Sequence, residues 1–205
     1  MGTFNKVTKE SLDSIQINAG MILNTFNPSA PKAPAKGEVV CATTGGITAN
    51  CTPSFEDFGA DIDNCPNNTL EMKKITGWDC TFSFTALDIN AETIKLSLGA
   101  AANIGNEIQP KADVMPAHFK TIWFISERVD DKIVAISLEN ALSTGGFSYK
   151  TQKNGKGQLT VTLTGHVSIE DEEDVPMKFY ICSEDDGLSG TMLLTTTADE
   201  EDNED

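Results

Sequence analysis

Residues 80–87, "CTFSFTAL", alternate strictly between two kinds of side chain. Cys80, Phe82, Phe84 and Ala86 are apolar or weakly polar, and the residues between them carry hydroxyl groups. Successive side chains of a β-strand point to opposite faces of a sheet. The stretch therefore predicts a strand with one face in a core and the other face in a more polar environment.

This strand leads directly into a short helix in "DINAETIKLSLGAA", residues 88–101. Asn90 is a good N-cap residue, and Gly99 is a natural helix stop. We expect Ala91, Ile94 and Leu98 to form the face that packs on the sheet. A helix of only two to three turns needs such docking to be stable.

Two hairpins are predicted further along the chain. Residues 119–126 and 132–138 are strand-like and flank "ERVDD", and residues 146–152 and 157–169 flank a turn centred on Asn154 and Gly155. In the last of these strands one face is apolar throughout. Its predicted core residues are Leu159, Val161, Leu163, Val167 and Ile169.

The first part of the chain predicts a hairpin arm over residues 38–53, which turns on Gly45 and Gly46. In that register Cys41 and Cys51 point to opposite faces and cannot form a disulfide. We expect all five cysteines to be thiols. Residues 24–37 are Pro-rich and indicate an extended linker, and residues 54–72 indicate a long polar loop.

Together these patterns predict a single, mainly β domain over residues 1–183. Its expected architecture is an antiparallel β-sandwich or flattened barrel with one short flanking α-helix and projecting loops. Residues 184–205 are predicted to be an acidic, disordered tail. No run of about 18 apolar residues is present, so no membrane partner is expected.

Charge is distributed unevenly. Residues 1–169 carry 17 acidic and 14 basic residues, whereas residues 170–205 carry 14 acidic residues and only Lys178. A negative field repels phosphate, which disfavours ordinary nucleic-acid binding. The densest negative segment is the acidic run, which consists of Glu170, Asp171, Glu172, Glu173 and Asp174. It is either a solvated loop or, in an assembly, part of a negatively charged channel surface that lets DNA pass without binding its phosphates.

No motif for nucleophilic, phosphate-binding or dinucleotide chemistry is present. The histidines, His118 and His166, are distant from any close cysteine pair, so neither a metal site nor a cofactor is expected. Each histidine fits a structural role better than that of a general base, and no catalytic residue is assigned.

The predicted strands carry little charge, and unprotected strand edges tend to pair with other chains. The residue 38–53 hairpin is also too apolar to stand alone comfortably in water. Both features favour self-association, because a closed ring of identical subunits satisfies every edge in turn.

The order of these segments resembles the major tail (tail tube) proteins of long-tailed bacteriophages. The likeness covers residues 12–183. It rests on "SIQINAGMILNTFNP", "GEVVCATTGGITANCTPSFEDFG", "GWDCTFSFTALDINAETIKLSLGAA" and "GFSYKTQKNGKGQLTVTLTGHVSIEDEEDVPMKFYI".

The resemblance implies a structural, non-enzymatic subunit that forms hexameric rings, which stack into a tube around a DNA-conducting channel. Its partners would be other copies of itself, the passing DNA without specific binding, and the tape-measure, terminator and baseplate or tip proteins. Its location would be the virion tail, after synthesis in the bacterial host cytoplasm. The residues matched to the inter-subunit arm are Val39, Val40, Ile47 and Cys51.

A different class of function stays open at this point. A carbohydrate- or protein-binding β-sandwich, for virion decoration or adhesion, would use Trp78, Trp123 or Tyr149 as a stacking platform. Aromatic residues make up only 7% of the chain, which makes such a platform small. An enzyme built around His118 or His166 is a third hypothesis.

Overall fold

A computed structural model describes residues 6–170 and 175–183. Antiparallel sheet makes up nearly half of the described chain, and one helix packs on it. The strands are β1 (Met21–Leu23), β2 (Val39–Cys41), β3 (Thr43–Asp57), β4 (Lys73–Ala86), β5 (Ala101–Ile104), β6 (Glu107–Pro110), β7 (Lys120–Glu127), β8 (Lys132–Ser143), β9 (Ser148–Lys150), β10 (Gln158–Thr164) and β11 (Met177–Ser183). The helices are α1 (Lys9–Asp13) and α2 (Ala91–Leu98), with short 3-10 turns η2 (Leu70–Met72) and η3 (Pro116–His118).

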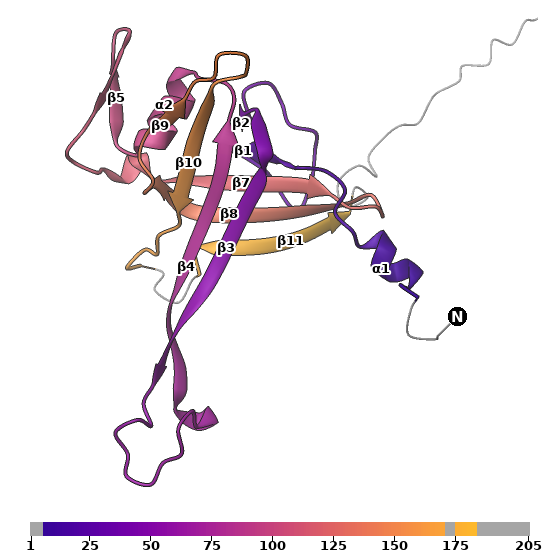
Figure 1. Cartoon of the computed structure of the whole chain (residues 1–205), viewed down its shortest axis with the longest axis vertical. Helices are drawn as coiled ribbons and strands as arrows, with labels where there is room; N and C mark the ends of the chain where they lie inside the picture. Colours follow the sequence, from indigo (N-terminus) through magenta and orange to yellow (C-terminus); the bar gives the residue numbers. More distant parts are fainter. Residues whose placement is uncertain (1–5, 171–174, 184–205) are drawn as a thin grey trace, which may run out of the picture.

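The main sheet has the order β2-β1-β7-β8-β10-β4-β3, with β11 paired to β8 and β9 paired to β10. Figure 1 shows that β7, β8 and β11 run across the molecule behind β10, β4 and β3, so the sheet forms two crossing layers. β8 belongs to both layers, because its first part pairs with β7 and β11 and its last residues pair with β10. The β-sandwich expected from the sequence is confirmed.

The core lies between these layers. The strand at residues 80–87 is confirmed: Cys80, Phe82, Phe84 and Ala86 are almost fully buried. They meet side chains of the other layer and of β10. Those partners include Ile22, Ile122, Phe124, Leu138, Leu159, Val161 and Leu163. Removing these side chains from water is the main stabilising contribution to the fold.

Helix α2 begins at the predicted cap. The Asn90 side chain accepts hydrogen bonds from the backbone N–H groups of Glu92 and Thr93, and the Thr93 hydroxyl accepts from Asn90 N–H in return. The predicted packing face was wrong. Thr93 and Ser97 are the buried helix residues, because their hydroxyl groups bond to nearby carbonyl oxygens and so can be buried at little penalty.

The predicted hairpin turn at Gly45 and Gly46 was also wrong. Both glycines lie inside β3, where the register with β4 shifts between Thr44 and Ile47. Their positive φ angles, 77° and 82°, suit such a bulge as well as a tight turn. β3 pairs instead with β4 along its whole length, and β2 pairs with β1.

The last predicted strand is shorter than expected. β10 ends at Thr164, so Leu159, Val161 and Leu163 are buried while Val167 and Ile169 are exposed. Gly165, the next residue, still donates its N–H to the Cys80 carbonyl, and among the described residues no pairing with β4 is made beyond it. The two downstream hairpins, β7–β8 and β9–β10, formed as predicted.

Residues 24–37 form an irregular surface loop whose ends are joined, since Asn24 N–H donates to the Glu38 carbonyl at 2.8 Å. Pro31 of this loop is buried. The short helix α1 was not predicted, and Thr8 caps it by accepting from Ser11 N–H. In the described residues no helix has the length and apolar character needed to cross a membrane.

Candidate assembly surface

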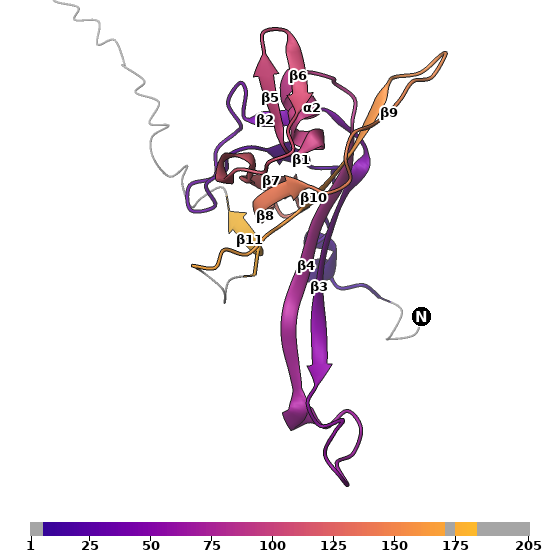
Figure 2. The ribbon, with the colours of Figure 1, turned by 90° about the vertical axis from the view of Figure 1, so that its left-hand side faces the viewer.

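One hairpin extends far beyond the body of the molecule. We call residues 52–79 the arm; it contains the outer halves of β3 and β4 and the tip between them. Figures 1 and 2 show it as a two-stranded ribbon that leaves one end of the sandwich. At the arm root, Cys51 and Cys80 are opposite each other and still contact the core. Beyond them the described residues provide neither a third strand nor a covering helix.

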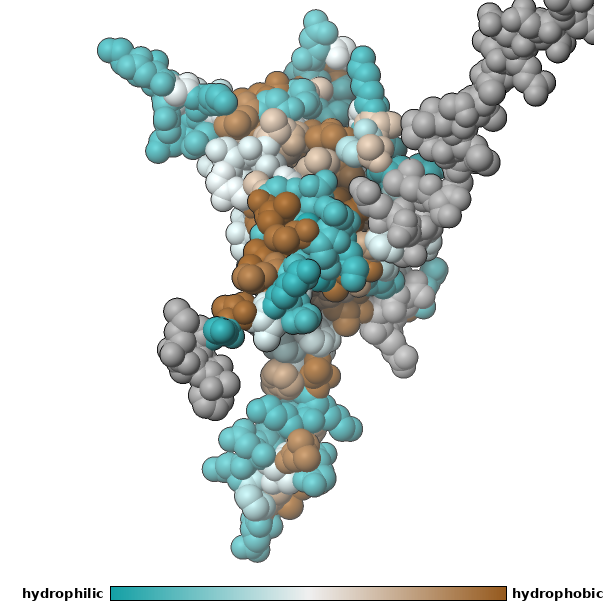
Figure 3. Space-filling view, turned by 90° about the vertical axis from the view of Figure 1, so that its right-hand side faces the viewer, coloured by the Kyte–Doolittle hydropathy of each residue, from teal (hydrophilic) through white to brown (hydrophobic). Residues whose placement is uncertain are grey.

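The arm carries apolar side chains along one of its faces. Trp78 lies on the same face as Cys80 and is paired with Pro53. Phe55, two residues from Pro53, lies on that face too and is paired with Ile75 beyond the register shift in β4. Phe55 is 55% exposed and Leu70 is 84% exposed. Figure 3 shows these hydrophobic side chains mixed with hydrophilic ones along the arm below the body. Isolated two-stranded hairpins are only marginally stable in water, so such an arm gains stability from a partner.

The tip of the arm is held in a defined shape. The Asp57 carboxylate accepts from Gly59 N–H at 2.9 Å and from Asn68 N–H at 3.2 Å, which ties the two sides of the tip together. Phe58 N–H donates to the Met72 carbonyl at 3.0 Å. Gly59 is buried, and a Cβ there would lie 3.1 Å from Cys65 Sγ.

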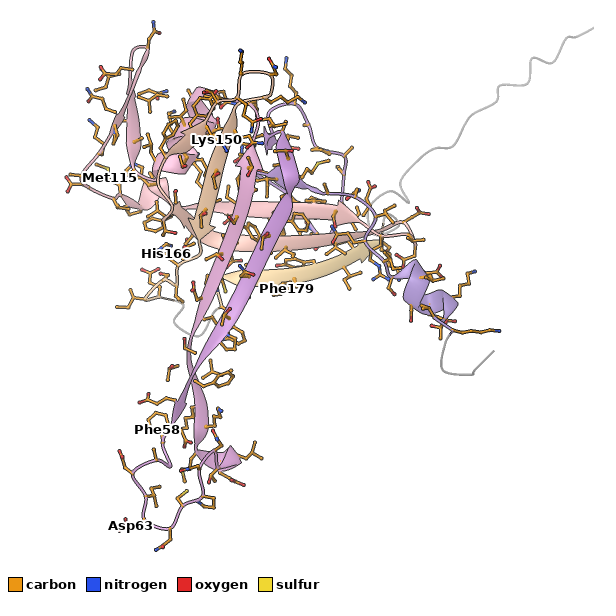
Figure 4. All side chains as sticks on the ribbon, in the orientation of Figure 1. Phe58, Asp63, Met115, Lys150, His166 and Phe179 are labelled. Atoms are coloured by element: carbon orange, nitrogen blue, oxygen red, sulfur yellow. The ribbon has the colours of Figure 1, made fainter. Side chains whose placement is uncertain are left out.

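Charged side chains surround this tip. Figure 4 labels Phe58 and Asp63 near the end of the arm. Within residues 52–79 there are six acidic residues and two basic ones, Lys73 and Lys74, which gives a net charge of −4. The two lysine ammonium groups lie over the rings of Phe55 and Phe58, at 5.4 and 5.7 Å. The arm therefore combines apolar contact area with a negative charge.

A basic hairpin projects from the opposite end. Residues 147–157 comprise β9 and the loop that joins it to β10, and they contain Lys150, Lys153 and Lys156 and no acidic residue. All three lysines are exposed. Because Leu159 pairs with Ala86 at the end of β4 remote from the arm, this loop must lie away from the tip, as Figure 2 shows. We call residues 147–157 the lysine hairpin.

A third uncovered surface lies on β11. This strand pairs with β8 and forms an edge of the sheet in the described residues. Phe179 and Ile181, on the core-facing side of the strand, are 63% and 66% exposed. Figure 4 shows Phe179 beside the crossing strands of the body.

The four residues assigned to the inter-subunit arm lie near the body rather than at the tip. Val40 is buried in this chain's own core, and Ile47 and Cys51 pack against that core. Val39 is exposed on β2. Their contact with another subunit stays a prediction. The projecting arm was missed because a hairpin turn was predicted at Gly45 and Gly46, so residues 54–72 were predicted to be a loop. In the structure β3 runs through both glycines and pairs with β4.

The acidic run lies mostly outside the described residues. Only Glu170 is described, and its backbone N–H donates to Ser168 Oγ at 3.2 Å. Asp171, Glu172, Glu173 and Asp174 are not described, so the predicted exposure of this run toward a channel or toward the outside stays a prediction. The predicted tail, residues 184–205, also lies outside the described residues.

The alternative functional residues are not brought together. Trp78 lies on the arm and Tyr149 on the lysine hairpin, at opposite ends of the molecule. Trp123 packs between Phe26 and Tyr180, with ring centroids 5.6 Å away in both cases. They therefore do not form a common stacking platform.

The two histidines bond to backbone groups. His118 Nδ1 accepts from Met115 N–H at 2.9 Å, and His166 Nδ1 donates to the Asn140 carbonyl at 3.1 Å. In each imidazole, Nδ1 is thus hydrogen-bonded to the backbone, and the structural role expected of both histidines stays a prediction. Among the described residues, no three His, Cys, Asp or Glu side chains gather as metal ligands would.

Comparison with known proteins gives structural overlaps only. Neither a family model nor a curated protein matches the chain. A chain from the "Virion of native gene transfer agent (GTA) particle" overlaps with a TM-score of 0.39 and 9% identity, covering 80% of this chain and 96% of that one. A chain from the "Tail of empty GTA particle computed with helical refinement, C6 symmetry" gives 0.35 and 9%, covering 73% and 92%.

Proposed function

We propose that this protein is a structural subunit of a bacteriophage tail tube. Copies polymerise as stacked, hexameric rings around a DNA-conducting channel, without catalysis and without a cofactor. The subunit is made in the cytoplasm of the bacterial host and resides in the virion tail. There it meets further copies of itself and the other tail proteins, namely the tape measure, the terminator and the baseplate or tip.

The observation that carries this proposal is the arm. A hairpin with exposed apolar side chains along one face and a tied tip is built for contact, yet the described part of the chain leaves it uncovered. The free edges of β3 and β11 add backbone groups that neighbouring copies can pair with or cover. A head-to-tail contact between identical copies closes into rings or extends into filaments, and a tube requires both.

The charges indicate how rings would stack. The arm tip is negative and the lysine hairpin at the opposite end is positive. When copies stack in one orientation, the tip of one meets the lysine hairpin of the next. Opposite charges speed such encounters and disfavour a stack in which like ends meet. The acidic run would then be left free to face the channel or the outside.

Charge reversal tests this arrangement. A variant with Lys150→Glu, Lys153→Glu and Lys156→Glu should keep its fold, because the three side chains are exposed, but should form tubes roughly tenfold more slowly at low salt. The measurement is light scattering during assembly, with electron microscopy of the product. Circular dichroism of the variant controls for folding.

A compensating variant makes the test specific. Asp61→Lys and Asp63→Lys, placed on the arm of the reversed variant, should restore a large part of the assembly rate. On the wild-type background the same two changes should slow it. The stacking arrangement is wrong if the lysine reversal leaves assembly unchanged, or if it slows assembly and the arm changes slow it further.

A further inference from the structure

The two cysteines at the arm root lie directly opposite each other. Cys51 of β3 pairs with Cys80 of β4, and their Sγ atoms are 3.0 Å apart. Opposed residues of an antiparallel ladder have Cα atoms about 4.5–5.5 Å apart. Protein disulfides span Cα separations of about 4.4–6.8 Å. The backbone therefore already holds these two thiols at a separation that a disulfide needs.

The remaining cysteines have other neighbours. Cys41 lies in β2 opposite Ile22, and Cys182 lies in β11 opposite Ile133. At the arm tip, Cys65 Sγ contacts Thr69 Oγ1 at 3.3 Å. Cys51 and Cys80 are thus the pair that the strand register brings together.

The position of this pair is mechanically important. Cys80 is fully buried, whereas its neighbour Asp79, one residue farther out, is exposed. The pair therefore marks the place where β3 and β4 leave the core and begin to project. Cys51 is only partly buried, so it is the more accessible of the two residues to a reagent from solvent.

We propose that Cys51 and Cys80 form an intramolecular, cross-strand disulfide when the protein meets a low-molecular-weight disulfide such as oxidised glutathione. The bond would fasten the two strands at the arm root and limit how far they splay. This inference rests on the β3–β4 pairing alone and holds whether or not the protein is a tail subunit. Under the proposed function, the thiols would be reduced during assembly in the cytoplasm and oxidised after release.

The chemistry is two successive thiol–disulfide exchanges. The Cys51 thiolate attacks one sulfur of oxidised glutathione, which breaks that S–S bond and releases one glutathione thiolate. The Cys80 thiolate then attacks Cys51 Sγ, forms the Cys51–Cys80 bond and releases the second glutathione. The two cysteines lose two electrons in total, oxidised glutathione gains them, and the two released protons are taken up by the glutathione thiolates.

Peptide mapping tests the assignment. The full chain is equilibrated in oxidised and reduced glutathione, quenched with acid, alkylated and cut with trypsin. Cleavage after Lys36, Lys73, Lys74 and Lys95 leaves Cys51 in peptide 37–73 and Cys80 in peptide 75–95. We expect these two peptides to be linked, with a mass two hydrogens below their sum, and to separate on reduction.

Peptide 37–73 also contains Cys41 and Cys65, so the linkage must be located within it. Fragmentation of the linked peptide should place the bond at Cys51, and the Cys41→Ser, Cys65→Ser double variant should still form it. The Cys51→Ser and Cys80→Ser variants should each lose it by tenfold or more. The proposal is overturned if wild-type protein gives no linked peptide, or if fragmentation places the bond at Cys41 or Cys65.

Discussion

At the residue scale, whether an apolar strand residue is buried depends on where its strand ends. Phe82 and Phe84 were assigned to the core because residues 80–87 alternate strictly and both lie on the apolar face of that strand. Both are buried in the structure. In the predicted strand over residues 157–169, Val167 and Ile169 continue the alternation of Leu159, Val161 and Leu163. They are exposed because β10 ends at Thr164, before either residue is reached. Gly165, just past that end, lies so close to Leu138 that a Cβ there would be 2.7 Å from its side chain. Local pattern shows which residues alternate but not where a neighbour stops the strand.

The burial of Cys41 in the core can be tested by the pH dependence of the free energy of unfolding. Burial, with a smaller contribution from the Asp88 carboxylate, raises the pKa of the Cys41 thiol to about 12. The pKa of a cysteine in an unfolded chain is about 8.5. The folded state therefore holds the Cys41 proton more tightly than the unfolded state does. The resulting contribution to the free energy of unfolding is fully present below a pH of about 8.5 and is lost progressively as the pH rises toward 12.

We expect the free energy of unfolding of the wild type to fall between pH 8 and pH 10.5 more steeply than that of Cys41→Ala, as measured by urea titration. Comparing the two slopes cancels the other groups that titrate in this range. Cys65→Ala, at the arm tip, is the matched control and should keep the wild-type slope. Equal slopes for wild type and Cys41→Ala would show that Cys41 is not held neutral by burial.

At the element scale, the helix and the arm illustrate opposite outcomes. The start of α2 could be predicted because an N-cap is a local feature, and Asn90 and Thr93 are close in sequence. The packing face of α2 could not, since Ser97 is buried only because its hydroxyl bonds to the Ile94 carbonyl and its own carbonyl accepts from Ser143 Oγ. The arm was assigned to the wrong residues because a Gly-Gly pair fits both a tight turn and a bulge.

The N-cap of α2 gives an element-scale prediction. Asn90→Ala removes the acceptor for two backbone N–H groups and should lower the free energy of unfolding by about 1 kcal/mol. Urea unfolding followed by circular dichroism measures it. Asn90→Ser, which can still cap, should recover a large part of the loss. A loss below about 0.3 kcal/mol for the alanine variant would mean that the helix start is held by packing instead.

The arm gives a second prediction at this scale. Phe55 and Ile75 are directly paired, so residues 56–74 can be replaced by Asn-Gly, which joins paired strands in a two-residue hairpin turn. The body lies beyond this cut. We expect the melting temperature to change by no more than about 4 °C, while tube formation is abolished.

Scanning calorimetry and electron microscopy check the two parts of that prediction separately. Tubes of normal length from the shortened protein would show that the arm is not needed for assembly. A large fall in the melting temperature would show instead that the arm stabilises the isolated subunit.

At the scale of the whole molecule, the two-layered sandwich could be predicted, because several alternating strands and short turns admit few other solutions. The placement of the arm and the lysine hairpin at opposite ends could not. It depends on pairings between distant residues, such as Leu159 with Ala86 and Thr43 with the same residue. This polarity, negative at the arm and positive opposite it, is what suits the subunit to stacking in one direction.

The central claim is that the arm and the free strand edges are exposed in one subunit and are covered by identical subunits in an assembly. The most direct measurement is electron microscopy of the concentrated full-length protein, combined with light scattering to obtain its mass. The account predicts hollow tubes of stacked rings that form more readily as concentration rises. Particles with the mass of one chain at every concentration and salt level would contradict it.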